Sequence, residues 1–272
     1  MKKSLREEFP SVVDKVYQLY KRYPHVEDIM SRDPVTISPN ATMLKAARIM
    51  GERHIGSLLV NQRGKTIGIV TERDLLSKVI AAGRKPEDVK VEEVMSTQLV
   101  TIKPITSVKE AARTMIREKG RLVVMEEGSA VGIITAADLI KMLPAVESEL
   151  KVDDAMTPKV TMVSEDTPVE TVAGIMGQRR IGSVIVTRGE NSVGIFTERD
   201  LLSKIIAGKA SMKTGVGEVV SSPLVAIPSG TSIHEVARLM SEKHIRRLPV
   251  VGADGKMVGI VTARDLVEAY AK

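Results

Sequence analysis

Four copies of a Gly-hydrophobic-hydrophobic-Thr-x-x-Asp motif hold the polar groups of this sequence that are best placed for chemistry. The copies occupy residues 68–74, 132–138, 194–200 and 259–265. A threonine three residues before an aspartate at the start of a helix is first of all a capping box, in which each side chain bonds the other residue's amide. The same helix terminus presents free amides and a positive dipole end, which attract a phosphate.

Two further features of the motif favour a ligand. Its glycine leaves room in the strand for close approach of a ligand or of another backbone. In three copies an arginine stands before the aspartate (Arg73, Arg199 and Arg264), whereas the second copy has Ala137. Threonine and arginine suit the phosphate of a nucleotide, and aspartate suits its ribose hydroxyls. The complete Thr-Glu-Arg-Asp turns favour the first and third copies as binding sites.

The sequence contains no comparable set of residues for enzymatic catalysis. The four histidines are not spaced as metal ligands, and the chain contains no cysteine. Neither a Gly-x-Ser-x-Gly elbow nor a phosphate-binding Walker loop is present. The sequence therefore predicts a non-enzymatic protein with no catalytic residue, no metal site and no required cofactor.

The motif spacing divides the chain into repeats. Its threonines lie at positions 71, 135, 197 and 262, so each unit has about 60 residues. Periodicity within a unit predicts a strand, a helix, two strands and a final helix, with the first strands at 35–37, 100–102, 160–162 and 225–227. Three strands cannot cover their own apolar face, so two units are expected to pack face to face in an α/β fold of the α+β type.

Composition and charge indicate the cellular compartment and the kind of partner. The 272 residues are 43% hydrophobic, and no apolar run approaches the roughly 20 residues that a membrane helix needs. Without a secretory segment or cysteines, the expected compartment is the cytoplasm. The net charge is +6, and half of that surplus falls in residues 1–25. This charge favours an anionic partner there, with a merely solvated surface as the alternative.

In its motifs and unit order the chain resembles a protein of four CBS domains, arranged as two tandem Bateman modules. The resemblance covers residues 26–272. It places module 1 at 26–145, with CBS domains at 26–83 and 91–144, and module 2 at 146–272, with CBS domains at 152–210 and 216–272. Residues 1–25 remain as a basic N-terminal helical extension.

The resemblance implies clefts that bind AMP, ADP, ATP or S-adenosylmethionine as a regulatory ligand. It assigns the ribose contact to the motif aspartates, the phosphate side to the threonines and arginines, and the adenine pocket to the first strand and the Gly-Ser pair of the odd-numbered units. The nucleotide-binding residues implied in this way are Thr71, Arg73, Asp74, Thr135, Asp138, Thr197, Arg199, Asp200, Thr262, Arg264, Asp265, Ile37, Gly56, Ser57, Met162, Gly182 and Ser183.

The N-terminal extension is the most individual part of the chain. Ser11 is a suitable cap for a helix that runs to about Arg22. Such a helix either packs against the repeats or docks the protein on a separate partner, on which it acts in trans. That partner is a protein or a ribonucleoprotein such as the ribosome. A homodimer is left open. The residues that suit docking on RNA are Lys2, Lys3, Arg6, Lys15, Tyr17, Tyr20, Lys21 and Arg22.

Overall fold

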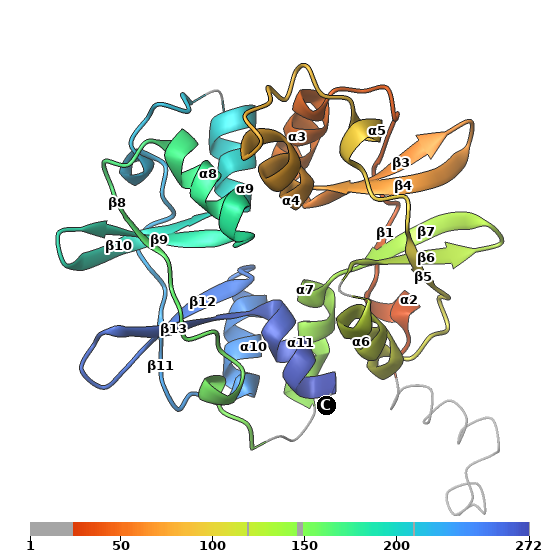
Figure 1. The fold of residues 1–272 in the computed structure, drawn as a ribbon. Helices are drawn as coiled ribbons and strands as arrows, with labels where there is room; N and C mark the ends of the chain where they lie inside the picture. The colour runs from red at the N-terminus through yellow and green to blue at the C-terminus, as the bar shows by residue number, and fades with distance from the viewer. Residues whose placement is uncertain (1–23, 119, 146–148, 209, 272) are drawn as a thin grey trace, which may run out of the picture.

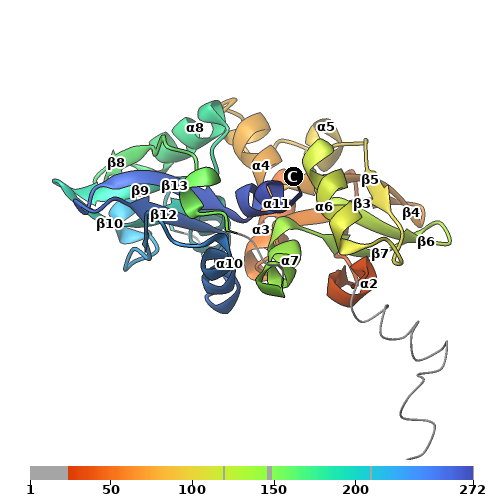
Figure 2. The same ribbon diagram turned by 90° about the horizontal axis from the view of Figure 1, so that it is seen from below.

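The computed structural model describes residues 24–118, 120–145, 149–208 and 210–271 and folds them into four similar α/β units. The helix expected between Ser11 and Arg22 lies outside these residues. The four units form a flat ring in the order 1, 2, 4, 3, so that unit 1 lies beside units 2 and 3, and Figure 1 shows this ring face-on and Figure 2 edge-on. The sheets lie at the rim, and the helices fill the space between them.

The elements repeat in the expected order. Unit 1 contains α2 (Val26–Ile29), β1 (Ser31–Arg32), β2 (Thr36–Ile37), α3 (Met43–Glu52), β3 (Ser57–Gln62), β4 (Lys65–Thr71), α4 (Glu72–Asp74) and the π-helix η1 (Leu75–Ile80). Unit 2 contains α5 (Val91–Val94), β5 (Val100–Ile102), α6 (Val108–Arg117), β6 (Leu122–Glu126), β7 (Ser129–Ile134), α7 (Ala136–Leu139) and the 3-10 helix η2 (Ile140–Ala145). The final helix expected in each unit is therefore present, but its winding differs between units.

The second half repeats this order. Unit 3 contains η3 (Val152–Asp154), β8 (Met162–Ser164), α8 (Val169–Arg179), β9 (Ser183–Arg188), β10 (Asn191–Thr197), α9 (Glu198–Asp200) and the π-helix η4 (Leu201–Ala207). Unit 4 contains η5 (Val216–Glu218), β11 (Ile227–Pro228), α10 (Ile233–Glu242), β12 (Arg247–Val251), β13 (Met257–Thr262) and α11 (Ala263–Ala271). The first strands β8 and β11 begin two residues later than the sequence predicts, because parallel pairing with β9 and β12 sets their bounds.

Local sequence explains most element boundaries. The hydroxyls of Thr42, Ser107 and Ser232 cap α3, α6 and α10 by accepting a hydrogen bond from the third helical amide. In unit 1, Arg63 and Gly64 both adopt positive φ angles of 50° and 81°, the geometry of a two-residue hairpin turn with the twist of its strands. In each unit the strand before the long helix, which is β2, β5, β8 or β11, pairs parallel with the next strand, and that strand pairs antiparallel with the last one.

In each module, the segment that precedes the parallel strand of one unit pairs with the last strand of the other unit, and these contacts join the units. Ser31 and Arg32 of unit 1 pair with β7 of unit 2, and Ser96 of unit 2 bridges Ile69 in β4 of unit 1. Thr157 and Ser221 make the matching bridges between units 3 and 4. The motif glycines make these crossings possible, because a Cβ on Gly68 would lie 2.8 Å from the carbonyl oxygen of Ser96. Of the two roles that the sequence allows for this glycine, the structure shows the close approach of another backbone.

The two modules pack with unit 1 against unit 3 and unit 2 against unit 4. Helix α3 of unit 1 lies on η4 of unit 3, and α8 of unit 3 lies on η1 of unit 1. A Cβ on Gly51 would lie 2.6 Å from the oxygen of Leu202, and a Cβ on Gly177 would lie 2.7 Å from that of Leu76, so both glycines are needed for this approach. Units 2 and 4 share the largest apolar core, which combines α6, α10 and α11. Within the described ranges, no helix has both the length and the apolar character needed to cross a bilayer.

Candidate functional site

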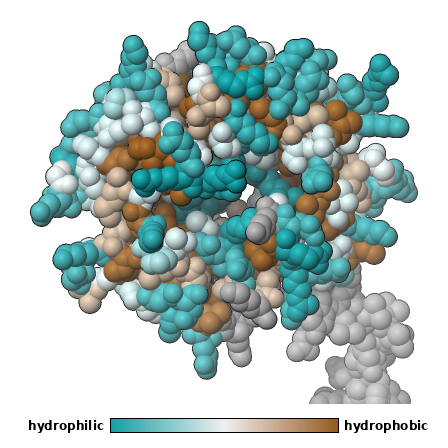
Figure 3. All heavy atoms as spheres, viewed as in Figure 1, coloured by the Kyte–Doolittle hydropathy of each residue, from teal (hydrophilic) through white to brown (hydrophobic). Residues whose placement is uncertain are grey.

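A cavity of about 1110 Å³ occupies the centre of the ring and extends into a cleft of each module. Figure 3 shows the hollow from one face, with hydrophilic residues around it. Eight arginines and lysines line the cavity against four carboxylates, so positive charge is concentrated where the modules meet. A cavity with this charge attracts anions, and its low-dielectric walls strengthen that attraction.

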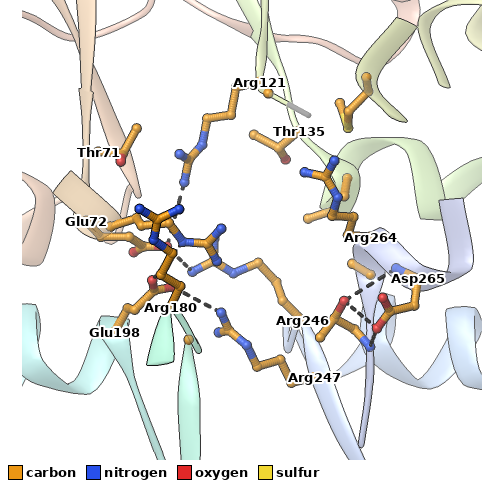
Figure 4. Close-up of a pocket in the computed structure, with 18 of the residues that line it drawn as sticks. Thr71, Glu72, Arg121, Thr135, Arg180, Glu198, Arg246, Arg247, Arg264 and Asp265 are labelled. Atoms are coloured by element: carbon orange, nitrogen blue, oxygen red, sulfur yellow. Dashed lines mark hydrogen bonds and ion pairs between the residues drawn. The ribbon is translucent and has the colours of Figure 1, made fainter. Parts of the chain in front are cut away.

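Two buried glutamates stand among the central arginines, as Figure 4 shows. Glu72 Oε1 lies 3.1 Å from an Nη of Arg246 and 3.7 Å from an Nη of Arg121. Glu198 Oε2 lies 3.0 Å from an Nη of Arg247, and its Oε1 lies 3.5 Å from Nε of Arg73. We call these six residues the central cluster. Because Glu72 and Arg246 belong to different modules, as do Glu198 and Arg73, the cluster ties the modules together.

The arginines of the central cluster favour the ionised form of Glu72. Burial by itself raises the pKa of Glu72, but Arg246, Arg121, Arg247 and Arg199 together bring its pKa below the ordinary value. Burial, with repulsion from Arg246, lowers the pKa of Arg121, although Glu72 opposes the shift. Two carboxylate oxygens in the cluster, Oε2 of Glu72 and Oε1 of Glu198, accept no hydrogen bond from the residues that the structure describes. Because four arginines face two glutamates, the positive charge of the cluster is only partly neutralised.

The cleft of module 2 brings together residues that the sequence places far apart. Thr161, Gly182 and Ser183 of unit 3 line the same cavity as Thr262, Arg264 and Asp265 of unit 4. The amide and the hydroxyl of Thr262 each donate to Asp265 Oδ2, both at 2.7 Å. Burial raises the pKa of Asp265 above its ordinary value, and the hydrogen bonds from Thr262 oppose that rise. A carboxylate of this kind, facing an open cleft, is suited to accept hydrogen bonds from a ligand.

The four capping boxes form as the sequence predicts, but the motif residues divide into two groups. Eight of the implied site residues line the cavity: Thr71, Arg73, Thr135, Gly182, Ser183, Thr262, Arg264 and Asp265. The others lie outside its lining, namely Ile37, Gly56, Ser57, Asp74, Asp138, Met162, Thr197, Arg199 and Asp200. Met162, for example, is 47% exposed at the start of β8.

Sequence reasoning does not assign the glutamates and most of the arginines of the central cluster to the nucleotide site. A signal for them is present, since the odd-numbered units carry Glu72 and Glu198 where the even-numbered units have alanine. The even-numbered units in turn carry Arg121 and Arg247 where the odd-numbered units have serine. Each of these arginines contacts the glutamate of its own module, so the two differences are complementary.

Two of the four histidines lie at equivalent places in the repeat. His54 and His244 occupy matching exposed positions just after α3 and α10, both with positive φ. Among the residues that the structure describes, no group of three or more His, Asp or Glu side chains could hold a metal ion.

Comparisons with known proteins agree with the four-unit architecture. A family model described as "CBS domain" matches residues 26–81, 91–145, 152–207 and 216–272. Protein MJ1404 of Methanocaldococcus jannaschii is 30% identical over 270 residues, which are 90% of this chain and 62% of that protein. A 33.4 kDa protein of Thermofilum pendens, described as lying in a ribosomal RNA operon, is 28% identical over 86% of this chain and 87% of its own length.

A solved structure extends the likeness to the whole ring. The crystal structure of MJ1225 from M. jannaschii, described as a putative archaeal homolog of g-AMPK, superposes with a TM-score of 0.76. The superposition covers 91% of this chain and 100% of that chain at 21% identity. At this identity the likeness shows a shared fold.

Proposed function

Because the chain belongs to the CBS domain family, whose domains are generally regulatory rather than catalytic, we propose that it is a nucleotide sensor that acts on a separate partner. It binds a phosphorylated adenine nucleotide in the central cavity and has no turnover of its own. The observation that carries the proposal is that one cavity holds both the Asp265 carboxylate, which is suited to ribose hydroxyls, and the arginines of the central cluster.

Different residues in the cleft of module 2 bind different parts of the nucleotide. Asp265 accepts hydrogen bonds from ribose hydroxyls, and the walls at Thr161 and Ile181–Ser183 enclose the base. Arg246, Arg247 and Arg180 reach the centre from the same cleft and bind the phosphates. The surplus of positive charge favours AMP, ADP and ATP over S-adenosylmethionine, because the sulfonium group of the latter is itself cationic.

The central cluster supplies a route from binding to output. A phosphate that engages Arg246 competes with Glu72 for the same guanidinium, and Glu72 lies in the other module. The contact between Arg73 and Glu198 also crosses between modules. Nucleotide binding therefore changes how firmly the modules are held together, and a partner that contacts both modules reads this change.

Calorimetry on the full chain with AMP, ADP, ATP and S-adenosylmethionine tests the proposal. We expect the phosphorylated nucleotides to bind and Asp265→Ala to weaken them by about 10- to 100-fold, the range for hydrogen bonds to a charged group. The control is Asp254→Ala, which removes an exposed aspartate near the β12–β13 turn and should leave affinity unchanged. Absence of binding by every nucleotide, or binding of S-adenosylmethionine alone, would overturn the proposal.

A second candidate function is docking on a polyanion such as structured RNA. It is favoured by the charge of residues 1–25, which hold half of the net +6 of the chain together with three of its four tyrosines. If phosphate contacts dominate, binding must weaken steeply as salt rises, through counterion release. Co-sedimentation with ribosomal subunits at low and high salt, using the full chain and a chain that starts at Val26, tests this function. Equal binding by both chains would remove the docking role of the N-terminal extension.

A further inference from the structure

The four motif aspartates do not offer the same hydrogen-bonding capacity to a ligand. In every unit the motif threonine donates twice to one carboxylate oxygen, Oδ2, from its amide and from its hydroxyl. Each carboxylate oxygen has two lone pairs, so Oδ2 is fully used by the capping box. A ribose hydroxyl must therefore bind Oδ1, and the state of Oδ1 decides whether a cleft is open.

Lysines occupy Oδ1 in the first three units. Lys78 Nζ lies 2.7 Å from Oδ1 of Asp74, and Lys204 Nζ lies 2.7 Å from Oδ1 of Asp200. In unit 2, Lys141 Nζ lies 3.1 Å from Oδ1 of Asp138. Each of these lysines takes up at least one of the two lone pairs that a ribose hydroxyl would use.

The lysines of units 1 and 3 are fixed in place by further bonds. Lys78 donates to the carbonyl oxygen of Val94 at 2.6 Å, and Lys204 donates to that of Val219 at 2.8 Å. In unit 3 the hydroxyl of Ser221 also donates to Oδ1 of Asp200, at 2.7 Å. Oδ1 of Asp200 therefore has no lone pair left, whereas Oδ1 of Asp74 has one.

Unit 4 is different at one position. Lys78 and Lys204 stand four residues after their aspartates, and the matching residue after Asp265 is Ala269. Within the described part of the chain, neither a hydrogen bond nor an ion pair reaches Oδ1 of Asp265. Asp265 is also the one motif aspartate, among those described, that lines the central cavity.

We propose that Lys204 closes its own cleft to ribose, that Lys78 leaves only one lone pair of Asp74 Oδ1 for a ribose hydroxyl, and that Ala269 leaves the Asp265 cleft open as the primary adenosine site. Ser221 completes the closure at Asp200. In units 1, 3 and 4, the side chain four residues after the aspartate then determines how well the cleft accepts ribose. This proposal rests on the proposed function and names which cleft carries it.

Two sets of variants test the proposal by calorimetry with ATP on the full chain. Ala269→Lys installs in unit 4 the lysine of units 1 and 3 and should lower affinity by about 10- to 100-fold. Ala269→Met, which has similar length without the charge, should retain affinity within about threefold and so controls for bulk. Conversely, the Lys204→Met, Ser221→Ala double variant should open the Asp200 cleft and raise the number of nucleotides bound per chain.

The outcomes separate this proposal from the function on which it rests. A wild-type chain that binds no nucleotide refutes the proposed function itself. A wild-type chain that binds ATP, but loses it on Asp74→Ala or Asp200→Ala and not on Asp265→Ala, overturns the assignment of the open cleft alone. Equal affinity of Ala269→Lys and Ala269→Met overturns the role of the lysine, and circular dichroism of each variant shows whether it remains folded.

Discussion

Replacing Glu72 with glutamine should weaken the fold and strengthen nucleotide binding at once. Glu72 is 5% exposed and contacts Arg246 and Arg121, whose side chains are 23% and 22% exposed. Glutamine keeps the shape and can still accept a hydrogen bond from Arg246, but it leaves the two guanidinium groups without their anion. These groups then repel each other across the cavity, since Arg246 already lowers the pKa of Arg121.

The size of the loss follows from this environment. Removing one partner of a fully buried ion pair costs about 3–5 kcal/mol. Because the arginines are partly exposed and glutamine retains a hydrogen bond, we expect Glu72→Gln to lower the free energy of unfolding by about 1.5–3 kcal/mol. For a chain of this size that corresponds to a fall in Tm of about 3–10 °C.

The pH dependence has a defined sign. The pKa of Glu72 is lowered in the folded state, so its contribution is fully present above its unfolded pKa and is lost as pH falls through the folded value. The difference in stability between wild type and Glu72→Gln should therefore be full near neutral pH and shrink in acid, below the ordinary pKa of 4.5.

Thermal unfolding and calorimetry with ATP measure the two effects on the same variant. Affinity should rise, because glutamine competes with phosphate for Arg246 less well than glutamate does. Glu242→Gln is the matched control, since Glu242 is 60% exposed and lies 3.8 Å from Arg238, so its loss should cost less than about 0.5 kcal/mol. If Glu72→Gln is as stable as wild type, or binds ATP more weakly, the competition between glutamate and phosphate is refuted.

Three further predictions concern other parts of the molecule. Asp265→Asn should raise Tm at neutral pH while it weakens ATP binding, because burial raises the pKa of Asp265 and so penalises its ionised form. The melting curves of wild type and variant should converge below the ordinary pKa of 3.8, and a lower Tm of the variant at pH 7 would contradict this. Gly177→Ala should destabilise the chain by about 1–3 kcal/mol in urea unfolding, because its Cβ would lie 2.7 Å from the oxygen of Leu76, whereas Gly174→Ala in the same helix has open space and should stabilise it by up to about 1 kcal/mol. ATP incubated with repurified protein should be recovered intact by chromatography, and protein-dependent hydrolysis would disprove the absence of turnover.

The repeat alone determines much of the fold, because each unit's pattern is local. Hydroxyl caps such as Thr42, the capping box of Thr71 and Asp74, and the short apolar run of β3 act over a few residues, so the sequence predicts the order of strands and helices. The need to cover a three-stranded sheet predicts pairing of units. The ends of β8 and β11 are missed because pairing with a strand more than 20 residues away sets them.

The binding site depends on contacts that no local pattern contains. The sequence identifies Asp265 and Gly182 as candidate residues, but 83 positions separate them, and only the packing of unit 3 on unit 4 places both in one cavity. The pairing of Glu72 with Arg246 likewise crosses between modules, and the chemistry of each residue alone gives no sign of its partner. Local bonding fixes each aspartate at its helix start, whereas long-range packing decides which of its oxygens remains free for a ligand.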